Sequence, residues 1–143
     1  MARQPLPFPQ TVRLGWLLGC LLLGGSALHA APLADLLRDA RAADARQDSS
    51  TALGLFLQAD GAQPNDAVIL QKIARQYSDL VTDQPTVDAK KRYAQTALEY
   101  SQRAVVLNPQ DPVNVLSLAV CHGKLATYSD TRAKVKFSRL VSA

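Results

Sequence analysis

Two stretches of this 143-residue chain repeat one another with an offset of 45 residues. Pro64 and Pro109 define the offset, and each follows a run of apolar residues at helical spacing. Proline recurs where one helix must stop and the next must begin. Eight further pairs share the register: Ala52 and Ala97, Leu55 and Tyr100, Ala59 and Ala104, Asp66 and Asp111, Leu70 and Val115, Ile73 and Leu118, Ala74 and Ala119, and Tyr77 and His122. The pattern predicts a repeated helical hairpin.

The rest of the chain after residue 30 also favours helices. Leu33, Leu36, Leu37 and Ala40 share one face of the first segment, and no useful run shows the apolar alternation of a strand. With 48% hydrophobic and 20% charged residues, the chain is too apolar for disorder. We therefore expect an all-α fold of five to six helices with short links.

Local signals predict some of the helix ends. Ser49 or Ser50 is expected to cap the start of a helix that closes at Gly61. Asn65 or Asp66 is expected to cap the start of the next helix.

Residues 1–30 have the pattern of a secretory signal peptide. Arg3 and Arg13 precede an apolar run at 14–25, and small residues follow up to an expected cut after Ala30. The chain then divides into a leader, 1–30, and one helical domain, 31–143, exported most simply to the periplasm. An uncleaved anchor is the rival, although the run is shorter than the roughly twenty residues that span a bilayer. Lipidation at Cys20 within "LLGC" is a further alternative, so any membrane contact would come from this segment.

The paired helices resemble the tetratricopeptide repeat over roughly residues 32–143. Leu70, Ile73, Ala74 and Tyr77 fit the first helix of that repeat. The second helix is matched by Ala52, Phe56, Ala59 and Pro64, and again by Ala97, Ala104 and Pro109 with Ser101 in the aromatic's place and Tyr100 beside it. The resemblance implies antiparallel hairpins stacked as a short α-solenoid, here about two and a half hairpins.

Two departures from that repeat matter. The period exceeds the usual 34 residues or so, and the surplus falls around "TDQPTVDAKKR", of which "TDQPTVD" is expected to be a polar connection. This lengthened segment, with "AVCHGKLATYSD", resembles the helical repeats of the regulator of microtubule dynamics family and related exported bacterial proteins. That resemblance implies no tubulin role for a chain with this leader. The last hairpin also looks incomplete: Val135, Phe137, Leu140 and Val141 could cap the fold, pack on another chain, or end a truncated reading frame.

Few residues suggest chemistry. Cys121 and His122 are adjacent, and adjacent helical residues point about 100° apart, so core packing is favoured over a catalytic pair. Cys121 is the one cysteine after the leader, and one histidine with one cysteine cannot supply a metal site. The basic run at 90–92 lacks interleaved aromatics and is expected to be a solvated helix start rather than a nucleic-acid-binding stripe. We predict no cofactor, no nucleic acid and no enzymatic activity.

The repeat predicts a concave surface formed by the first helix of each pair. Such a surface suits an extended peptide or a partner helix, which makes a protein-binding adaptor the expected function. The rival is a structural subunit that homo-oligomerises through its incomplete last hairpin. The residues expected on the concave face are Leu37, Arg41, Gln71, Arg75, Asp79, Leu116, Val120 and Lys124.

Overall fold

The structure, a computed structural model, describes residues 27–129, with side chains from residue 32. This range holds five helices and no strands, which confirms the predicted all-α class. The helices are α1 (Ala27–Ala45), α2 (Ser49–Ala62), α3 (Ala67–Asp79), α4 (Val87–Leu107) and α5 (Pro112–Thr127). Cys20 and the apolar residues of the expected tail helix, from Val135 to Val141, lie outside the described residues.

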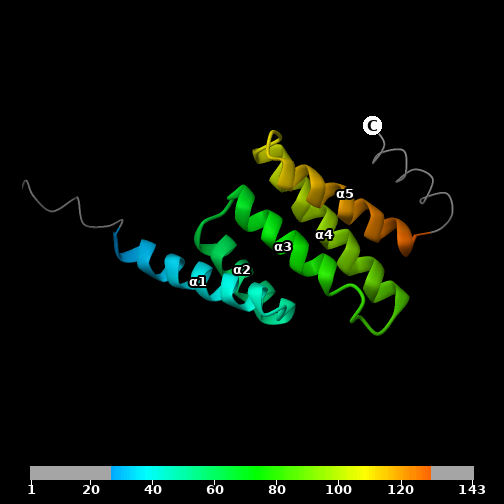
Figure 1. Ribbon diagram of the computed structural model, residues 1–143, viewed down its shortest axis with the longest axis horizontal. Coiled ribbons are helices and arrows are strands. Elements are labelled where there is room, and N and C mark those ends of the chain that lie inside the picture. The colour runs from blue at the N-terminus through cyan, green and yellow to red at the C-terminus, as the bar shows by residue number, and fades with distance from the viewer. Residues whose placement is uncertain (1–26, 130–143) are drawn as a thin grey trace, which may run out of the picture.

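Consecutive helices run back and forth and pack against one another (Figure 1). α3 also lies against α5, so the two helices that begin after Pro64 and Pro109 are neighbours in space. α3 occupies the centre of the described fold, in contact with α2, α4 and α5. This placement puts one face of α3 beside α5, the first helix of the following hairpin.

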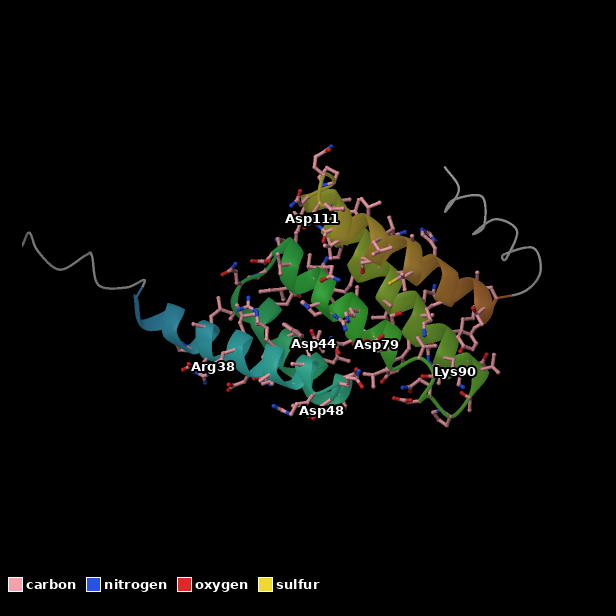
Figure 2. All side chains as sticks on the ribbon, in the orientation of Figure 1. Arg38, Asp44, Asp48, Asp79, Lys90 and Asp111 are labelled. Carbon is pink, nitrogen blue, oxygen red and sulfur yellow. The ribbon has the colours of Figure 1, made fainter. Side chains whose placement is uncertain are left out.

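The 45-residue register is visible in the helix ends. Asp66 caps the start of α3 by accepting from the N–H groups of Val68 and Ile69, and Asp111 caps α5 by accepting from the N–H of Val113. Figure 2 shows Asp111 at the turn between α4 and α5. At the other ends, the N–H groups of Gln63 and Asn108 donate to the carbonyls of Ala59 and Ala104. Matching caps therefore start and stop the matched helices.

The alanines of the repeat lie in the core of the described fold. Ala52, Ala59, Ala97 and Ala104 are all fully buried. Ser101, in the aromatic's place, is also buried and donates from Oγ to the carbonyl of Leu98 at 2.8 Å. The small side chains let the helix backbones approach, as the repeat predicted.

Two apolar clusters make up the described core. One joins α1, α2 and the beginning of α3 around Phe56, and the other joins the end of α3 with α4 and α5 around Leu98. Tyr77 and Tyr100 pack against both clusters and stack with ring centroids 5.9 Å apart. Tyr93 meets the Tyr77 ring edge-on at 5.4 Å. The aromatic residues thus connect the two halves of the core.

The helix ends predicted for α2 were wrong. Its N-cap is Asp48, whose Oδ1 accepts from the Thr51 N–H at 3.1 Å, rather than Ser49 or Ser50. The helix continues through Gly61 to Ala62 and is capped by Gln63. A carboxylate three residues before an N–H satisfies that donor as well as a serine hydroxyl does, and the sequence offers all three side chains in succession.

Three other findings concern the expectations from the sequence. α1 begins at Ala27 and contains Pro32, so it extends across the expected cleavage point. The polar connection expected around "TDQPTVD" (82–88) links α3 to α4, and α4 begins at its end, at Val87. Lys91 and Arg92 are exposed there, as expected for a solvated helix start. Val115 is 49% exposed although its partner Leu70 is buried, because no described helix covers that side of α5.

Candidate functional site

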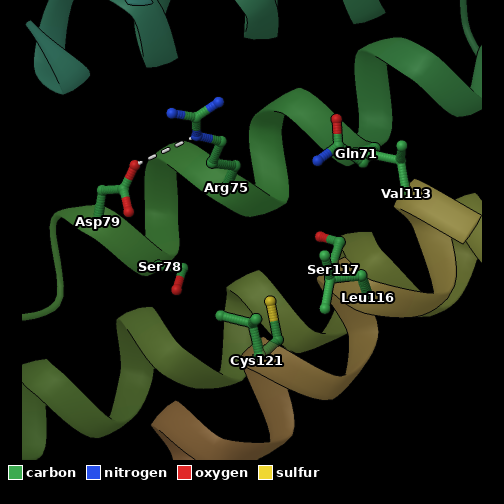
Figure 3. A pocket seen from close by; sticks show the side chains of 9 residues that line it. Gln71, Arg75, Ser78, Asp79, Val113, Leu116, Ser117 and Cys121 are labelled. Carbon is green, nitrogen blue, oxygen red and sulfur yellow. Dashed lines mark ion pairs between the residues drawn. The ribbon is translucent and has the colours of Figure 1, made fainter. Parts of the chain in front are cut away.

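Five of the eight predicted concave-face residues line one furrow between α3 and α5. The furrow has a cavity of about 320 Å³. Figure 3 shows its walls, with α3 on one side and α5 on the other. We call it the α3–α5 furrow; its lining residues are Gln71, Arg75, Ser78, Asp79, Val113, Leu116, Ser117, Val120 and Cys121.

The α5 wall of the furrow is apolar and open to solvent. Leu116 is 65% exposed and Val120 is 48% exposed, and Val113 is exposed beside them. Positions three and four residues apart share a helix face, so these three side chains form a continuous strip along α5. Large apolar side chains gathered in a concave surface indicate an interaction surface more often than isolated ones do.

The α3 wall is polar, and its charges compensate one another. Arg75 Nε lies 3.7 Å from Asp79 Oδ2, and the dashed line in Figure 3 marks this pair. Arg75 Nη1 also lies 3.9 Å from Asp44 Oδ2, on α1. Gln71, at the other end of the wall, is largely buried and uncharged. The mouth of the furrow therefore carries one cation and one anion held close together.

Asp44, on α1, connects the charged side chains of α3 to α1. Its Oδ2 accepts from Lys72 Nζ at 3.1 Å and its Oδ1 accepts from Gln76 Nε2 at 2.9 Å. Burial by itself would raise the pKa of Asp44, but the hydrogen bonds from Gln76 and Lys72 and the charges of Lys72 and Arg75 outweigh it and lower the pKa below its usual value. The carboxylate therefore stays ionised and fixes the orientation of α3 relative to α1.

Ser78 and Cys121 form the floor of the furrow, from α3 and α5 respectively (Figure 3). Ser78 is only 3% exposed, and its Oγ has no hydrogen-bond partner among the described residues. Cys121 is a buried free thiol. Burial raises its pKa, against the smaller opposing effect of the Ser101 and Ser117 hydroxyls.

The electrostatics of Cys121 and His122 oppose a nucleophilic role for that pair. An activated cysteine needs a lowered thiol pKa and a neighbouring base or cation, whereas burial raises the pKa of Cys121. Burial also lowers the pKa of His122, which disfavours the imidazolium that would stabilise a thiolate. His122 is half-buried rather than part of the core.

The other three predicted residues lie elsewhere. Leu37 and Arg41 line a separate furrow of about 170 Å³, together with Phe56, Asp66, Val68, Ile69 and Lys72. Lys124 lies half-buried in the last turn of α5 and lines neither furrow. The sequence placed all eight residues on one face, but the structure divides seven of them between two furrows and leaves Lys124 outside both.

Sequence reasoning missed Val113, Ser78 and Ser117 in the α3–α5 furrow. Val113 lies three residues before Leu116, so helical periodicity could have found it. Ser78 and Ser117 have the same spacing, three residues from Arg75 and Val120 respectively, but small polar residues on a helix are usually ordinary surface positions.

Two kinds of site are absent from the part of the chain that the structure describes. Residues 27–129 contain no group of three or more His, Cys, Asp or Glu side chains placed to hold a metal ion. Within the same range, no helix combines the length and the apolar character that crossing a bilayer would need.

The described fold and furrow define a class: an all-helical protein with a helical-repeat arrangement and a grooved face. The model of one protein family, regulator of microtubule dynamics protein 1-3, matches residues 35–143. The chain belongs to this family, as the resemblance around the lengthened repeat predicted. Searches of curated proteins and of solved structures found no match.

Proposed function

We propose that this protein is an exported, non-catalytic adaptor with a tetratricopeptide-repeat-like architecture. Its α3–α5 furrow would bind an amphipathic segment of another protein. The observation that carries the proposal is the exposed apolar strip of Val113, Leu116 and Val120 facing the polar wall of α3. Bound peptides and helices use such surfaces by laying apolar side chains along the strip and polar groups along the rim.

The architecture is supported by the matched helix caps and buried alanines at a 45-residue spacing. Export is supported by the leader-like pattern of residues 1–30, with the periplasm as the expected compartment. A non-catalytic role is supported by the buried Cys121, whose thiol pKa is raised rather than lowered.

Charge indicates the type of guest. Arg75 is compensated by Asp79 and Asp44, so the furrow presents no uncompensated charge that would select a strongly acidic or basic segment. We therefore propose a guest whose contact face is apolar with neutral hydrogen-bonding groups. Its affinity should depend little on salt, since screening acts mainly on attraction between opposite charges.

A peptide-display selection tests this function directly. Random peptides would be selected on the full chain in mild detergent and then measured against two variants. Val120→Glu places a charge in the apolar strip and should weaken binding of the selected peptides at least tenfold. Val106→Glu, at a position 80% exposed on α4 and outside the furrow, is the matched control and should leave binding unchanged.

Two results would overturn the proposal. One is a selection that enriches no peptide, and the other is a set of peptides that bind Val120→Glu as tightly as the parent. Light scattering over a concentration series tests the rival role as a self-associating subunit. A dimer that Val120→Glu converts to a monomer would show that a second copy covers the α5 strip.

A further inference from the structure

Ser78, in the last turn of α3, is an unusual serine for a helix. A buried helical serine normally donates to a carbonyl three or four residues back, as Ser101 does to Leu98 at 2.8 Å. Ser78 is equally buried, but its Oγ makes no hydrogen bond with the described residues. Because a buried hydroxyl without a partner costs free energy, its position on the floor of a furrow indicates a partner from outside.

The surroundings of Ser78 restrict that partner. Ser78 lines the same furrow as the exposed side chains of Leu116 and Val120, so a group that approaches Oγ from the furrow lies against apolar side chains. The part of the guest that contacts Leu116 and Val120 should therefore be apolar. The cavity, about 320 Å³, is at the lower end of the range of roughly 300–1,000 Å³ for ligand pockets, which suits one large side chain.

Charge restricts the partner further. The cation and the anion at the mouth, Arg75 and Asp79, already pair with one another. A lysine or glutamate tip at Ser78 would lose its water without gaining a counter-charge, so the tip must be neutral. A phenol hydroxyl both donates and accepts, and it can pair with Ser78 whichever way the serine hydroxyl is turned.

We propose that the α3–α5 furrow holds a tyrosine side chain of the bound segment, with its ring against Leu116 and Val120 and its hydroxyl hydrogen-bonded to Ser78 Oγ. This inference rests on the proposed function and names the anchor of the guest. Aromatic anchors with one polar end are the residues that most often dominate protein interfaces.

Two small probes test the anchor without any knowledge of the partner. p-Cresol carries the ring and hydroxyl of tyrosine, and toluene has the same ring and methyl group without the hydroxyl. Each would be titrated into the full chain while amide NMR signals of α3 and α5 are followed. We expect both probes to shift signals around Leu116 and Val120, with p-cresol binding roughly three- to tenfold more tightly because of the one added hydrogen bond.

Two variants assign the difference to Ser78. Ser78→Ala should lower the affinity of p-cresol to that of toluene and leave the affinity of toluene unchanged. Since this variant removes an unpaired hydroxyl, it should melt no lower than the parent, and a melting curve checks that it is folded. Ser129→Ala is the matched control; it removes a hydroxyl outside the furrow and should leave both affinities unchanged.

Several outcomes would overturn the tyrosine anchor: equal affinities of the two probes for the parent, shifts confined to other helices, or p-cresol binding that survives Ser78→Ala. These outcomes are separate from those that decide the proposed function. Selected peptides that depend on Val120 but contain no tyrosine would leave the adaptor role standing and reject the anchor. Probe binding as expected, with no peptide enriched, would reject the adaptor role alone.

Discussion

At the scale of single residues, Asp44 makes the most informative long-range interactions. It belongs to α1 yet contacts Lys72, Gln76 and Arg75 on α3, where Figure 2 places its label between the two helices. Charge-assisted hydrogen bonds to a carboxylate of low exposure are stronger than exposed ion pairs. By contrast, the pairs of Arg38 with Asp35 and Asp39 lie on an exposed face of α1.

Asp44 should make stability depend on pH in the acid range. Its pKa is lowered in the folded state, so its contribution is fully present above the ordinary value of 3.8 and is lost as the pH falls through the folded pKa. We expect Asp44→Asn to lower the free energy of unfolding by about 1 kcal/mol near pH 7 and to flatten the loss of stability below about pH 4.

Urea unfolding of the parent and the variant across pH 3–7 would measure this effect. Asp35→Asn, in an exposed ion pair, is the control and should leave the pH profile unchanged. Parallel profiles for the parent and Asp44→Asn would contradict the role given to this carboxylate.

At the scale of the helices, packing depends on small residues at repeated positions. Ala59 on α2 and Ala104 on α4 are both fully buried, and each accepts at its carbonyl from the C-cap residue of its own helix. A larger side chain at either position would have to push a neighbouring helix away. The loss of stability caused by the same substitution at the two positions can therefore be compared.

We expect Ala59→Leu and Ala104→Leu to lower the free energy of unfolding by similar amounts, about 1–3 kcal/mol each. Ala104→Trp adds a much larger ring at the same contact and should prevent folding. Ala42→Leu, on an exposed position of α1, is the control and should change stability by less than about 0.5 kcal/mol. Thermal and urea unfolding provide the measurement. A variant Ala104→Trp that melts like the parent would show that the register is wrong.

At the scale of the whole described molecule, the two core clusters meet at a tyrosine contact. Tyr77 packs against both clusters, contacts Tyr93 and Tyr100, and has a raised pKa, first because of burial and then because of those two rings. Cooperative unfolding requires that the halves of the core stabilise each other. Tyr77 and Tyr100 both touch the two clusters, and Tyr77 also contacts Tyr93, so we expect Tyr77 to contribute to that coupling.

Tyr77→Ala should therefore affect cooperativity as well as stability. We expect a loss of more than about 2 kcal/mol, and a calorimetric enthalpy that exceeds the van't Hoff enthalpy because the two clusters begin to unfold separately. Tyr128→Ala is the matched control, since Tyr128 packs against one cluster only. That variant should be destabilised but remain two-state. A single cooperative transition in Tyr77→Ala would show that the clusters are coupled by other contacts.

Several features of this protein could be predicted from the sequence because they depend on local patterns. Helical periodicity predicted the all-α class, and the 45-residue register located the buried alanines and paired Asp66 with Asp111, which both cap helices in the structure. Where several capping side chains adjoin, as at Asp48 and Ser49, the local pattern does not decide between them.

Other features depend on how far one helix is shifted and rotated against the next, and no short-range pattern encodes that offset. The tertiary structure alone separates Leu37 and Arg41 from the α3–α5 furrow, and it alone brings Asp44 to Lys72. It also places Ser78 and Cys121, 43 residues apart in the chain, on the same floor. Side chains that meet only through packing between helices become visible when the packing is known, because contact across helices is set by the whole core rather than by neighbours in the sequence.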